Sequence, residues 1–398
     1  AWEQRKLSEI AGKVTEKNTG LQYVETLTNS AEFGIISQRD FFDHDISKLG
    51  SLDGYYIVRN EDFVYNPRIS TSAPVGPINR NKLGRTGVMS PLYTVFRPHD
   101  IDTTYLEHFF KCGYWYSFMN FNGDSGARSD RFSIKDDVFF QMPIPVPHIE
   151  EQRKIGLFLT QLDHLITLHQ RKYDKLQVLK KAMLEKMFPK NGSSVPEIRF
   201  KGFTDAWEQR KLGEIVERIT RKNENLESTL PLTISAQYGL IDQNEFFDKR
   251  IASKDVSGYF LVKKGEFAYN KSTSSDAPWG AIKRLDRYES GVLSTLYIVF
   301  KILDESKTSS DYIVTYYNTD LWHKGIQAIA AEGARNHGLL NVAPADFFET
   351  NLTMPKDYAE QQQIGSFFQQ LDHLITLHQR ELEKLQNIKK SMLEKMFV

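Results

Sequence analysis

A ten-residue string, LDHLITLHQR, occurs twice without a change, at Leu162–Arg171 and at Leu371–Arg380. Around each copy, apolar residues recur every seven positions within a helical pattern of about 39 residues, 150–188 in the first copy and 359–397 in the second. A seven-residue apolar repeat predicts helices that pair along an apolar seam. Because two identical stripes can bury each other, the repeat favours pairing of the two helices over packing of each helix on its own domain.

The predicted seam is apolar except for one histidine in each copy. Its residues are Leu162, Leu165, Ile166 and His169 in the first helix and Leu371, Leu374, Ile375 and His378 in the second. A polar side chain in an apolar seam can fix the register of a helix pair. A histidine that merely tolerates a half-exposed seam fits the pattern equally well, so both interpretations stay open.

The repeated string belongs to a tandem duplication of the whole chain. AWEQRKLSEI at Ala1 returns as AWEQRKLGEI at Ala206, and FGIISQRDFFD at Phe33 returns as YGLIDQNEFFD at Tyr238. The second copy also carries PEIRFKGFTD directly before its AWEQRKL. The first copy begins at Ala1, so the sequence predicts that a similar lead-in is missing from this chain.

Short β-branched and aromatic runs bounded by Gly, Pro and Asn predict strands, for example at 55–58 and 92–96. Apolar residues at three- and four-residue spacing predict helices at 104–120 and 310–329. Each copy therefore reads as a mixed α/β domain followed by one long helix. The predicted boundaries are a first domain at 1–149, a long helix at 150–188, a Pro/Gly/Ser-rich linker at 189–205, a second domain at 206–358 and a second long helix at 359–398.

Connectivity predicts how the long helices run. The first domain precedes the first long helix and the second domain follows it, so the domains are expected at opposite ends of that helix. A second helix that pairs with the first must run back, so the pair is expected to be antiparallel. A helix of about 39 residues is roughly 58 Å long. The predicted fold class is α/β, with two domains related by an approximate two-fold axis and separated by an antiparallel coiled coil.

Composition limits the function classes. The chain has 398 residues, which is too long for one core, and a formal net charge of zero. Any surface for nucleic acid must therefore come from local clustering of charge. The single cysteine, Cys112, excludes an internal disulfide and fits a reducing compartment. No apolar run approaches the roughly 20 residues of a membrane span, and no signal peptide opens the chain, so a cytoplasmic protein without a membrane partner is expected.

The two copies differ most in a pair of loops within each domain. The first pair of loops is NPRISTSAPVGPINR at 66–80 and NKSTSSDAPWGAIKR at 270–284, and the second is NGDSGARSDRF at 122–132 and AEGARNHGLL at 331–340. Hydroxyls and backbone amides suit phosphate oxygens, and arginine suits guanine edges or phosphates. Similar scaffolds with unlike loops predict two sites of one kind that read two different targets. The alternative for any single residue is an ordinary solvated loop.

The candidate contacts to nucleic acid lie in these loops. In the first copy they are Arg68, Ser70, Thr71, Ser72, Arg80, Arg128 and Arg131. In the second copy they are Lys271, Ser272, Thr273, Ser274, Trp279, Lys283, Arg335, Asn336 and His337.

Catalytic motifs are not found in the sequence. It has no G-x-x-x-x-G-K-[ST] phosphate loop, no Cys/His cluster at metal-ligand spacing and no G-x-S-x-G nucleophile elbow. Asn66-Pro67 resembles the start of the Asn-Pro-Pro-aromatic motif of adenine methyltransferases. However, Arg68 follows where the motif has a second proline, and the other copy has Asn270-Lys271. The chain is therefore expected to bind rather than to catalyse, and to hold no metal and no cofactor.

Taken together, the motifs resemble the specificity subunits of type I restriction-modification systems. They stand here as PEIRFKGFTDAWEQRKLGEI, IPVPHIEEQRKIGLFLTQLDHLITLHQR and MPKDYAEQQQIGSFFQQLDHLITLHQR, with a GAR loop in each copy. The resemblance covers essentially the whole chain, and only the opening segment of the first repeat departs from it. It implies two target-recognition domains, each reading one half of a bipartite, asymmetric double-stranded DNA site, and a helical spacer between them.

The resemblance also implies partners. Two methyltransferase subunits, which carry S-adenosylmethionine and methylate adenine N6, would dock on the conserved helices. Two restriction subunits, which combine an ATP- and Mg-dependent motor with a nuclease, would join them for restriction.

Zero net charge suggests that the partners supply part of the phosphate contact, so the free chain is expected to bind DNA poorly. Two alternatives stay open: the DNA-reading part of a fused restriction-methylation enzyme, or an interaction scaffold that does not bind DNA.

Overall fold

A computed structural model describes residues 2–43, 49–124, 130–190, 192–235, 238–249, 251–274, 277–330 and 340–397. The chain divides into two compact units. Unit 1 comprises Ala1–Arg171 and Gln379–Val398, and unit 2 comprises Lys172–His378. Each unit contains one mixed α/β domain together with one end of each of two long helices.

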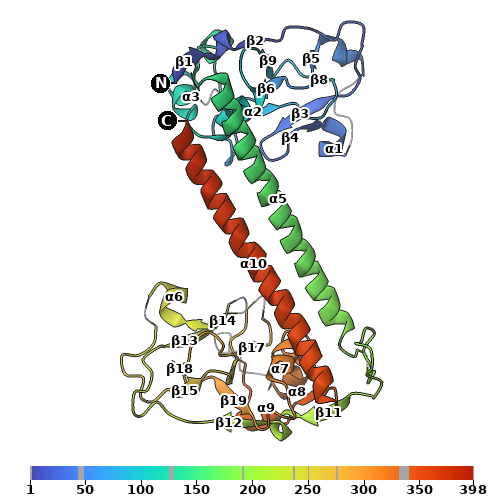
Figure 1. Cartoon of the computed structure of the whole chain (residues 1–398), viewed down its shortest axis with the longest axis vertical. Coiled ribbons are helices and arrows are strands. Elements are labelled where there is room, and N and C mark those ends of the chain that lie inside the picture. Colours follow the sequence, from blue (N-terminus) through green and yellow to red (C-terminus); the bar gives the residue numbers. More distant parts are fainter. Residues whose placement is uncertain are drawn as a thin grey trace. The chain divides into compact units, whose positions relative to one another are not determined.

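The domain of unit 1 is built on antiparallel strand pairs (Figure 1). Its strands are β1 (Glu3–Lys6), β2 (Ala11–Lys13), β3 (Leu27–Ser30), β4 (Gly34–Ser37), β5 (Tyr56–Val58), β6 (Phe63–Tyr65), β7 (Ile78–Arg80), β8 (Gly87–Met89), β9 (Thr94–Pro98) and β10 (Pro143–Val146). Its short helices are α1 (Gln38–Phe42), α2 (Thr103–Lys111), α3 (Tyr116–Asn122) and α4 (Asp136–Phe139). A four-stranded sheet has the order β2-β9-β6-β7, and β1–β10, β3–β4 and β5–β8 form separate pairs.

The domain of unit 2 repeats this topology. Its strands are β11 (Glu208–Lys211), β12 (Val216–Ile219), β13 (Leu232–Ser235), β14 (Gly239–Asp242), β15 (Phe260–Lys263), β16 (Phe267–Asn270), β17 (Ala281–Arg284), β18 (Ser290–Leu293), β19 (Ile298–Ile302) and β20 (Asn351–Met354). Its short helices are α6 (Gln243–Phe247), α7 (Ser310–Tyr316), α8 (His323–Ile329) and α9 (Pro344–Phe348). The sheet order β12-β19-β16-β17 and the pairs β11–β20, β13–β14 and β15–β18 match those of unit 1.

The two predicted long helices are present as α5 (Ile149–Lys186) and α10 (Tyr358–Met396), each one unbroken ribbon in Figure 1. In unit 1, Ile155 of α5 lines the same cavity as Met396 of α10, and Asp163 forms an ion pair with Lys389. In unit 2, Lys180 pairs with Asp372 at 2.5 Å, and the Phe188 ring lies 6.4 Å from that of Phe368. Residue numbers rise along α5 as they fall along α10, so the helix segments are antiparallel in each unit, as predicted.

The buried stripe of the long helices is narrower than the sequence predicts. Leu162, Leu371 and Ile375 are buried, and Ile166, His169 and His378 are half-buried. The placement of Leu165 and Leu374 in the seam is wrong, because each of these leucines is 40% exposed. The contact between two helices covers only a narrow stripe, so apolar residues on its flank stay open to solvent.

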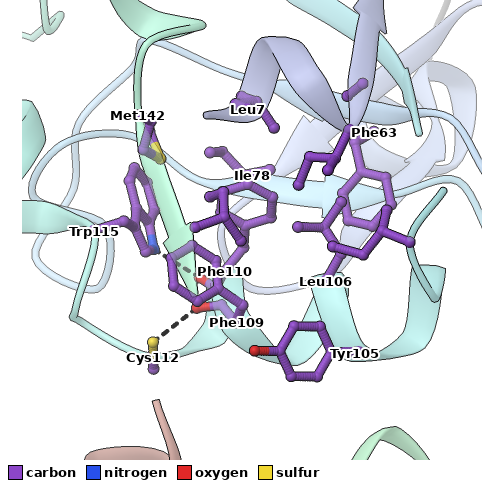
Figure 2. Packing of buried hydrophobic residues seen from close by; sticks show 14 of the residues in the cluster. Leu7, Phe63, Ile78, Tyr105, Leu106, Phe109, Phe110, Cys112, Trp115 and Met142 are labelled. Atoms are coloured by element: carbon purple, nitrogen blue, oxygen red, sulfur yellow. Dashed lines mark hydrogen bonds between the residues drawn. The ribbon is translucent and has the colours of Figure 1, made fainter. Parts of the chain in front are cut away.

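The helix predicted at 104–120 is in fact two helices, α2 and α3, and that at 310–329 is likewise α7 and α8. In unit 1 the break falls at Cys112-Gly113, where the indole of Trp115 donates to the carbonyl of Phe110 at 3.1 Å (Figure 2). In unit 2 the Thr319 hydroxyl donates to the Tyr316 carbonyl at 2.6 Å and closes the equivalent turn. These side-chain bonds replace helical backbone bonds, which apolar periodicity alone does not reveal.

The strands predicted at 55–58 and 92–96 are present as β5 and β9, although 92 lies in the turn before β9. The core of unit 1 lies between the four-stranded sheet and helices α2 and α3. In Figure 2, Leu106, Phe109 and Phe110 pack beside Met142 and Phe63. No helix within the described ranges is long and apolar enough to cross a membrane.

One buried group distinguishes the two cores. His108 of α2 is buried, and its Nε2 lies 3.2 Å from the Thr160 hydroxyl of α5. Its Nδ1 has no hydrogen-bond partner among the described residues. Burial, followed by the charge of Lys111, lowers the pKa of His108 from 6.5 to about 4. The corresponding residue of α7 is Thr315.

We expect unit 1 to lose stability as the pH falls from 6.5 to about 4. The unfolded chain binds a proton at His108 in this window while the folded chain does not, so the loss approaches about 3 kcal/mol. The variant His108→Thr should lack this loss of stability at low pH. Urea unfolding at pH 7 and at pH 4.5, followed through unit 1, measures the difference; the same pH slope in both proteins would contradict the assignment.

Candidate nucleic-acid interface

The first candidate loop of unit 1 joins β6 to β7 through a tight bend. The Asn66 amide donates to the Pro77 carbonyl at 3.0 Å, and Gly76 has a φ of 84°. A Cβ atom at Gly76 would lie 2.1 Å from the Asn66 carbonyl oxygen, so only glycine fits there. The bend leaves Arg68 and the hydroxyl residues Ser70, Thr71 and Ser72 exposed.

The second candidate loop of unit 1 pairs with the first. The Ile69 amide donates to the Asp130 carbonyl at 3.0 Å, and the Phe132 amide donates to the Pro67 carbonyl at 2.7 Å. These bonds place Arg68 opposite Arg131 in an isolated antiparallel bridge. Residues opposite each other in such a bridge point their side chains to the same face. The structure therefore brings together two arginines that are 63 residues apart in the sequence.

The paired arginines line an open cleft. A cavity of about 430 Å³ is lined by Arg68, Ser70, Ser72 and Arg131, and a second cavity of about 450 Å³ shares Arg131. Neither arginine forms an ion pair with any described residue. The two guanidinium groups offer planar donors that suit phosphate oxygens or a guanine edge, and the Glu32 carboxylate also lines the first cavity.

The serines of this loop also stabilise its shape. The hydroxyl oxygens of Ser70 and Ser72 lie 3.2 Å apart, and the Ser70 hydroxyl accepts a hydrogen bond from the Ala73 amide at 3.2 Å. Thr71 stands exposed between them. The hydroxyls are thus presented at the rim of the cleft by a turn that they help to hold.

Arg80, a predicted contact, lies away from the cleft. Its side chain is 10% exposed and pairs with Glu107 at 2.6 Å and with Glu61 at 3.1 Å, which ties β7 to α2. Arg284 occupies the same position in unit 2 and pairs with Asp311 at 2.8 Å. Arginines at this position therefore connect sheet to helix, and we assign Arg80 a structural role in place of the predicted contact.

In unit 2 the corresponding loop carries different side chains. The Lys271 carbonyl accepts from the Leu340 amide at 2.9 Å, as the Pro67 carbonyl accepts from Phe132 in unit 1. The Ser272 amide donates to the Asn270 side chain, as Arg68 does to Asn66, so a serine stands where unit 1 has an arginine. Ser272 and Ser274 are exposed and Thr273 is half-buried.

Three further residues of unit 2 are less open to a ligand than predicted. Burial lowers the pKa of Lys271, whose ammonium lies 3.5 Å from the Val342 carbonyl oxygen. Trp279 is half-buried against the core, and its carbonyl accepts from the Tyr269 hydroxyl at 2.8 Å. Lys283 donates to Asn318 at 3.0 Å, and burial together with Lys180 lowers its pKa. The Lys283 ammonium is therefore held by the turn between α7 and α8. The remaining predicted contacts, Arg128, Arg335, Asn336 and His337, lie outside the described residues.

No sequence motif indicates the aromatic side chains that lie at the cleft of unit 1 and at one hairpin tip of each unit. Phe41 and Phe42 of α1 line the 430 Å³ cavity with Tyr93. At the tip of the β3–β4 hairpin Phe33 is 60% exposed, and Tyr238 at the β13–β14 tip is equally exposed. Both aromatics precede a glycine of positive φ, Gly34 at 71° and Gly239 at 77°. The sequence pattern that could have indicated these two residues is an aromatic residue directly before a turn glycine at the same position of both copies.

The side chains at the cleft of unit 1 are groups that bind a ligand through hydrogen bonds, charge and stacking. Within the described part of the chain, no three or more His, Cys, Asp or Glu side chains gather in a way that could hold a metal ion. The cleft of unit 1 presents arginine, hydroxyl and aromatic groups, which together suit the phosphates and base edges of a nucleic acid.

Comparison with known proteins gives a consistent result. Residues 1–178 match the family model of the type I restriction modification DNA specificity domain. The S subunit of a type I restriction-modification system from M. genitalium is similar over 100% of this chain and 96% of its own, with a TM-score of 0.59 and 12% identity. The HsdS subunit from Thermoanaerobacter tengcongensis has a TM-score of 0.44 and 14% identity, over 100% of this chain and 96% of its own.

The likeness to the M. genitalium subunit indicates a shared fold, and the family match covers the repeat whose cleft is described above. The second repeat has the same strand order and pairing as the first. The part of this chain that is similar to a type I restriction modification DNA specificity domain is thus residues 1–178.

Proposed function

We propose that this chain reads a bipartite, asymmetric double-stranded DNA sequence, with one α/β domain for each half, as the specificity subunit of a type I restriction-modification complex. The pairing of Arg68 with Arg131 carries this proposal, because it joins the two divergent loops of unit 1 into one cleft that presents two arginines. The equivalent loop of unit 2 has the same backbone contact and different side chains. Two domains that share a backbone arrangement and differ in their loop side chains suit a target whose two halves differ.

We further propose that the long helices carry the docking sites for two methyltransferase subunits. Leu165 and Leu168 of α5 are exposed, as are their counterparts in the repeated string, Leu374 and Leu377 of α10. Exposed leucines at matching positions of two copies fit two equivalent partners, one for each helix. The methyltransferase subunits would bring S-adenosylmethionine for adenine N6 methylation, and two further restriction subunits would bring ATP and Mg. The complex would act in the cytoplasm.

The variant Arg131→Ala tests the reading of one half-site. We expect the chain, assembled with its methyltransferase subunits, to lose about 1–3 kcal/mol of discrimination at the half-site read by unit 1, or roughly 5- to 150-fold. Selection from a random duplex library measures both half-sites at once. Lys6→Ala is the matched control, because Lys6 is exposed and lines neither cavity.

Two outcomes of this selection count against the proposal. An equal loss at both half-sites would mean that Arg131 adds only general affinity, and an unchanged target would mean that the cleft does not read DNA. The zero net charge of the chain leads us to expect that partner subunits supply part of the contacts to DNA phosphates. Tight sequence-specific binding of DNA by the chain alone, with a steep salt dependence, would contradict this expectation.

A further inference from the structure

Each domain holds an exposed aromatic ring at the tip of the same hairpin. Phe33, at the β3–β4 tip, and Tyr238, at the β13–β14 tip, are each 60% exposed. The Ser30 hydroxyl accepts a hydrogen bond from the Phe33 amide at 3.2 Å, and the Ser235 hydroxyl accepts one from the Tyr238 amide at 3.2 Å. A turn of the same construction therefore presents both rings to solvent.

A leucine is presented in the same way on a second turn of each domain. Leu92 is 60% exposed and Leu296 is 57% exposed. The Leu92 amide lies 3.4 Å from the Ser90 hydroxyl, and the Leu296 amide lies 3.4 Å from that of Ser294. The exposure of these leucines is thus a property of both copies.

The short helix after each hairpin adds a third exposed apolar side chain. Helix α1 lies beside the β3–β4 hairpin (Figure 1). Phe41 of α1 is 41% exposed, and Phe246 of α6 is 45% exposed. We call these three positions the apolar rim, which consists of Phe33, Phe41 and Leu92 in unit 1 and of Tyr238, Phe246 and Leu296 in unit 2.

In unit 1 the apolar rim adjoins the cleft of the two arginines. Phe41 and Leu92 line the same 430 Å³ cavity as those arginines. The Phe33 ring lies 6.3 Å from the Phe41 ring, edge to face. A cluster of exposed apolar side chains beside polar groups marks an interaction site. A ligand held by the arginines would therefore also meet the rim.

The apolar rim is alike in the two units, whereas the loops beside it differ. A serine, Ser272, stands at the position of Arg68, but each rim position is aromatic or leucine in both copies. The rim therefore suits a contact that both half-sites share whatever their sequence. Every base has a flat π-face, so stacking on an aromatic ring tolerates any sequence. In a duplex this face is reached only between base pairs, where DNA-binding proteins insert apolar side chains such as phenylalanine and leucine.

We propose that Phe33 and Tyr238 each insert their ring between two base pairs at one half-site and so anchor that half-site without selecting its sequence. This inference rests on the proposed reading of DNA and adds to it a contact of a different kind. The exposed Glu32 carboxylate beside Phe33 would repel a phosphate, so this tip suits bases better than the DNA backbone. A methyltransferase subunit is also common to both halves, but a surface for that subunit alone would not need to share a cavity with the arginines.

The variants Phe33→Ala and Tyr238→Ala test the proposal in the chain assembled with its methyltransferase subunits. Each should weaken binding of the duplex that the unaltered complex selects by roughly 5- to 150-fold, the range expected for the loss of one stacked base. The selected motif should stay the same, in contrast to Arg131→Ala. Phe33→Tyr and Tyr238→Phe keep the ring and should bind as the unaltered complex does. Val24→Ala is the matched control, because Val24 is 62% exposed and lines neither the 430 Å³ nor the 450 Å³ cavity.

Oxidation by permanganate, which attacks unstacked thymines, locates the contact on the DNA. Duplexes that carry thymine at each unspecified position in turn should show reactive thymines at both half-sites in the unaltered complex. Phe33→Ala should remove the reaction at the half-site read by unit 1 and leave the other, and Tyr238→Ala should do the reverse. The thymine opposite each methylated adenine is left out of the comparison, because base flipping exposes it.

Unchanged affinity of both alanine variants would overturn the inference, as would a change in the selected motif. Weaker assembly of Phe33→Ala with the methyltransferase subunits in the absence of DNA would make the apolar rim a protein contact and would also overturn it. These outcomes leave the proposed function intact. Failure of the unaltered complex to select a bipartite motif would overturn the proposed function itself, and this inference with it.

Discussion

Deleting seven residues from each long helix, His164–Gln170 from α5 and His373–Gln379 from α10, is expected to shorten the gap between the two recognised half-sites by about three base pairs. The two windows have the same sequence, HLITLHQ, so the deletion keeps the repeat intact on both sides. Seven helical residues correspond to about 10.5 Å, and a base pair to about 3.4 Å along the duplex. Methylation mapping in cells that express the variant with its methyltransferase subunit reads the gap directly.

The opposite change is the control for the deletion. Inserting a second HLITLHQ into each helix should lengthen the gap by about three base pairs, because both changes act through helix length alone. Complete loss of methylation in the deletion variant, with a lengthened gap in the insertion variant, would still agree with a helical spacer. An unchanged gap in both variants would remove the spacer role from the helices.

Glu360→Gln is expected to lower the free energy of unfolding of unit 2 by about 3–5 kcal/mol, because it leaves the guanidinium of Arg199 poorly exposed and without its counter-charge. The amide also weakens the hydrogen bond from Trp207. Urea unfolding combined with hydrogen exchange reports the two units separately.

Glu151→Gln makes the same chemical change in unit 1, where the carboxylate is exposed and bonded only by Trp2 among the described residues. It should cost less than about 1 kcal/mol. Similar losses in the two variants would contradict the view that the hydrogen bonds from Arg199 to Glu360 make the difference.

The duplication made most of the fold predictable. The repeated string LDHLITLHQR identified both long helices, and α5 and α10 end within two residues of the predicted 150–188 and 359–397. Connectivity predicted their antiparallel direction. The sequence did not reveal the breaks between α2 and α3 or between α7 and α8, because a tryptophan and a threonine side chain replace backbone bonds there.

The candidate site was predictable in its loops and less so in its residues. Arg68 and Arg131 both came from divergent loops, but their pairing depends on backbone hydrogen bonds between segments far apart in the sequence. Arg80 and Lys283 are basic residues of the predicted loops, and yet Arg80 pairs with two carboxylates and Lys283 donates to Asn318. A basic side chain on a loop or strand does not reveal its partner until the fold is known.

We propose above all that two domains of one fold read two unlike half-sites. Sequencing of N6-methyladenine across the genome of cells that express this chain with its methyltransferase subunit tests it most directly. We expect one bipartite motif, with different bases in its two halves, a methylated adenine in each half and a fixed run of unspecified base pairs between them. A single continuous motif, or two identical half-sites, would contradict it.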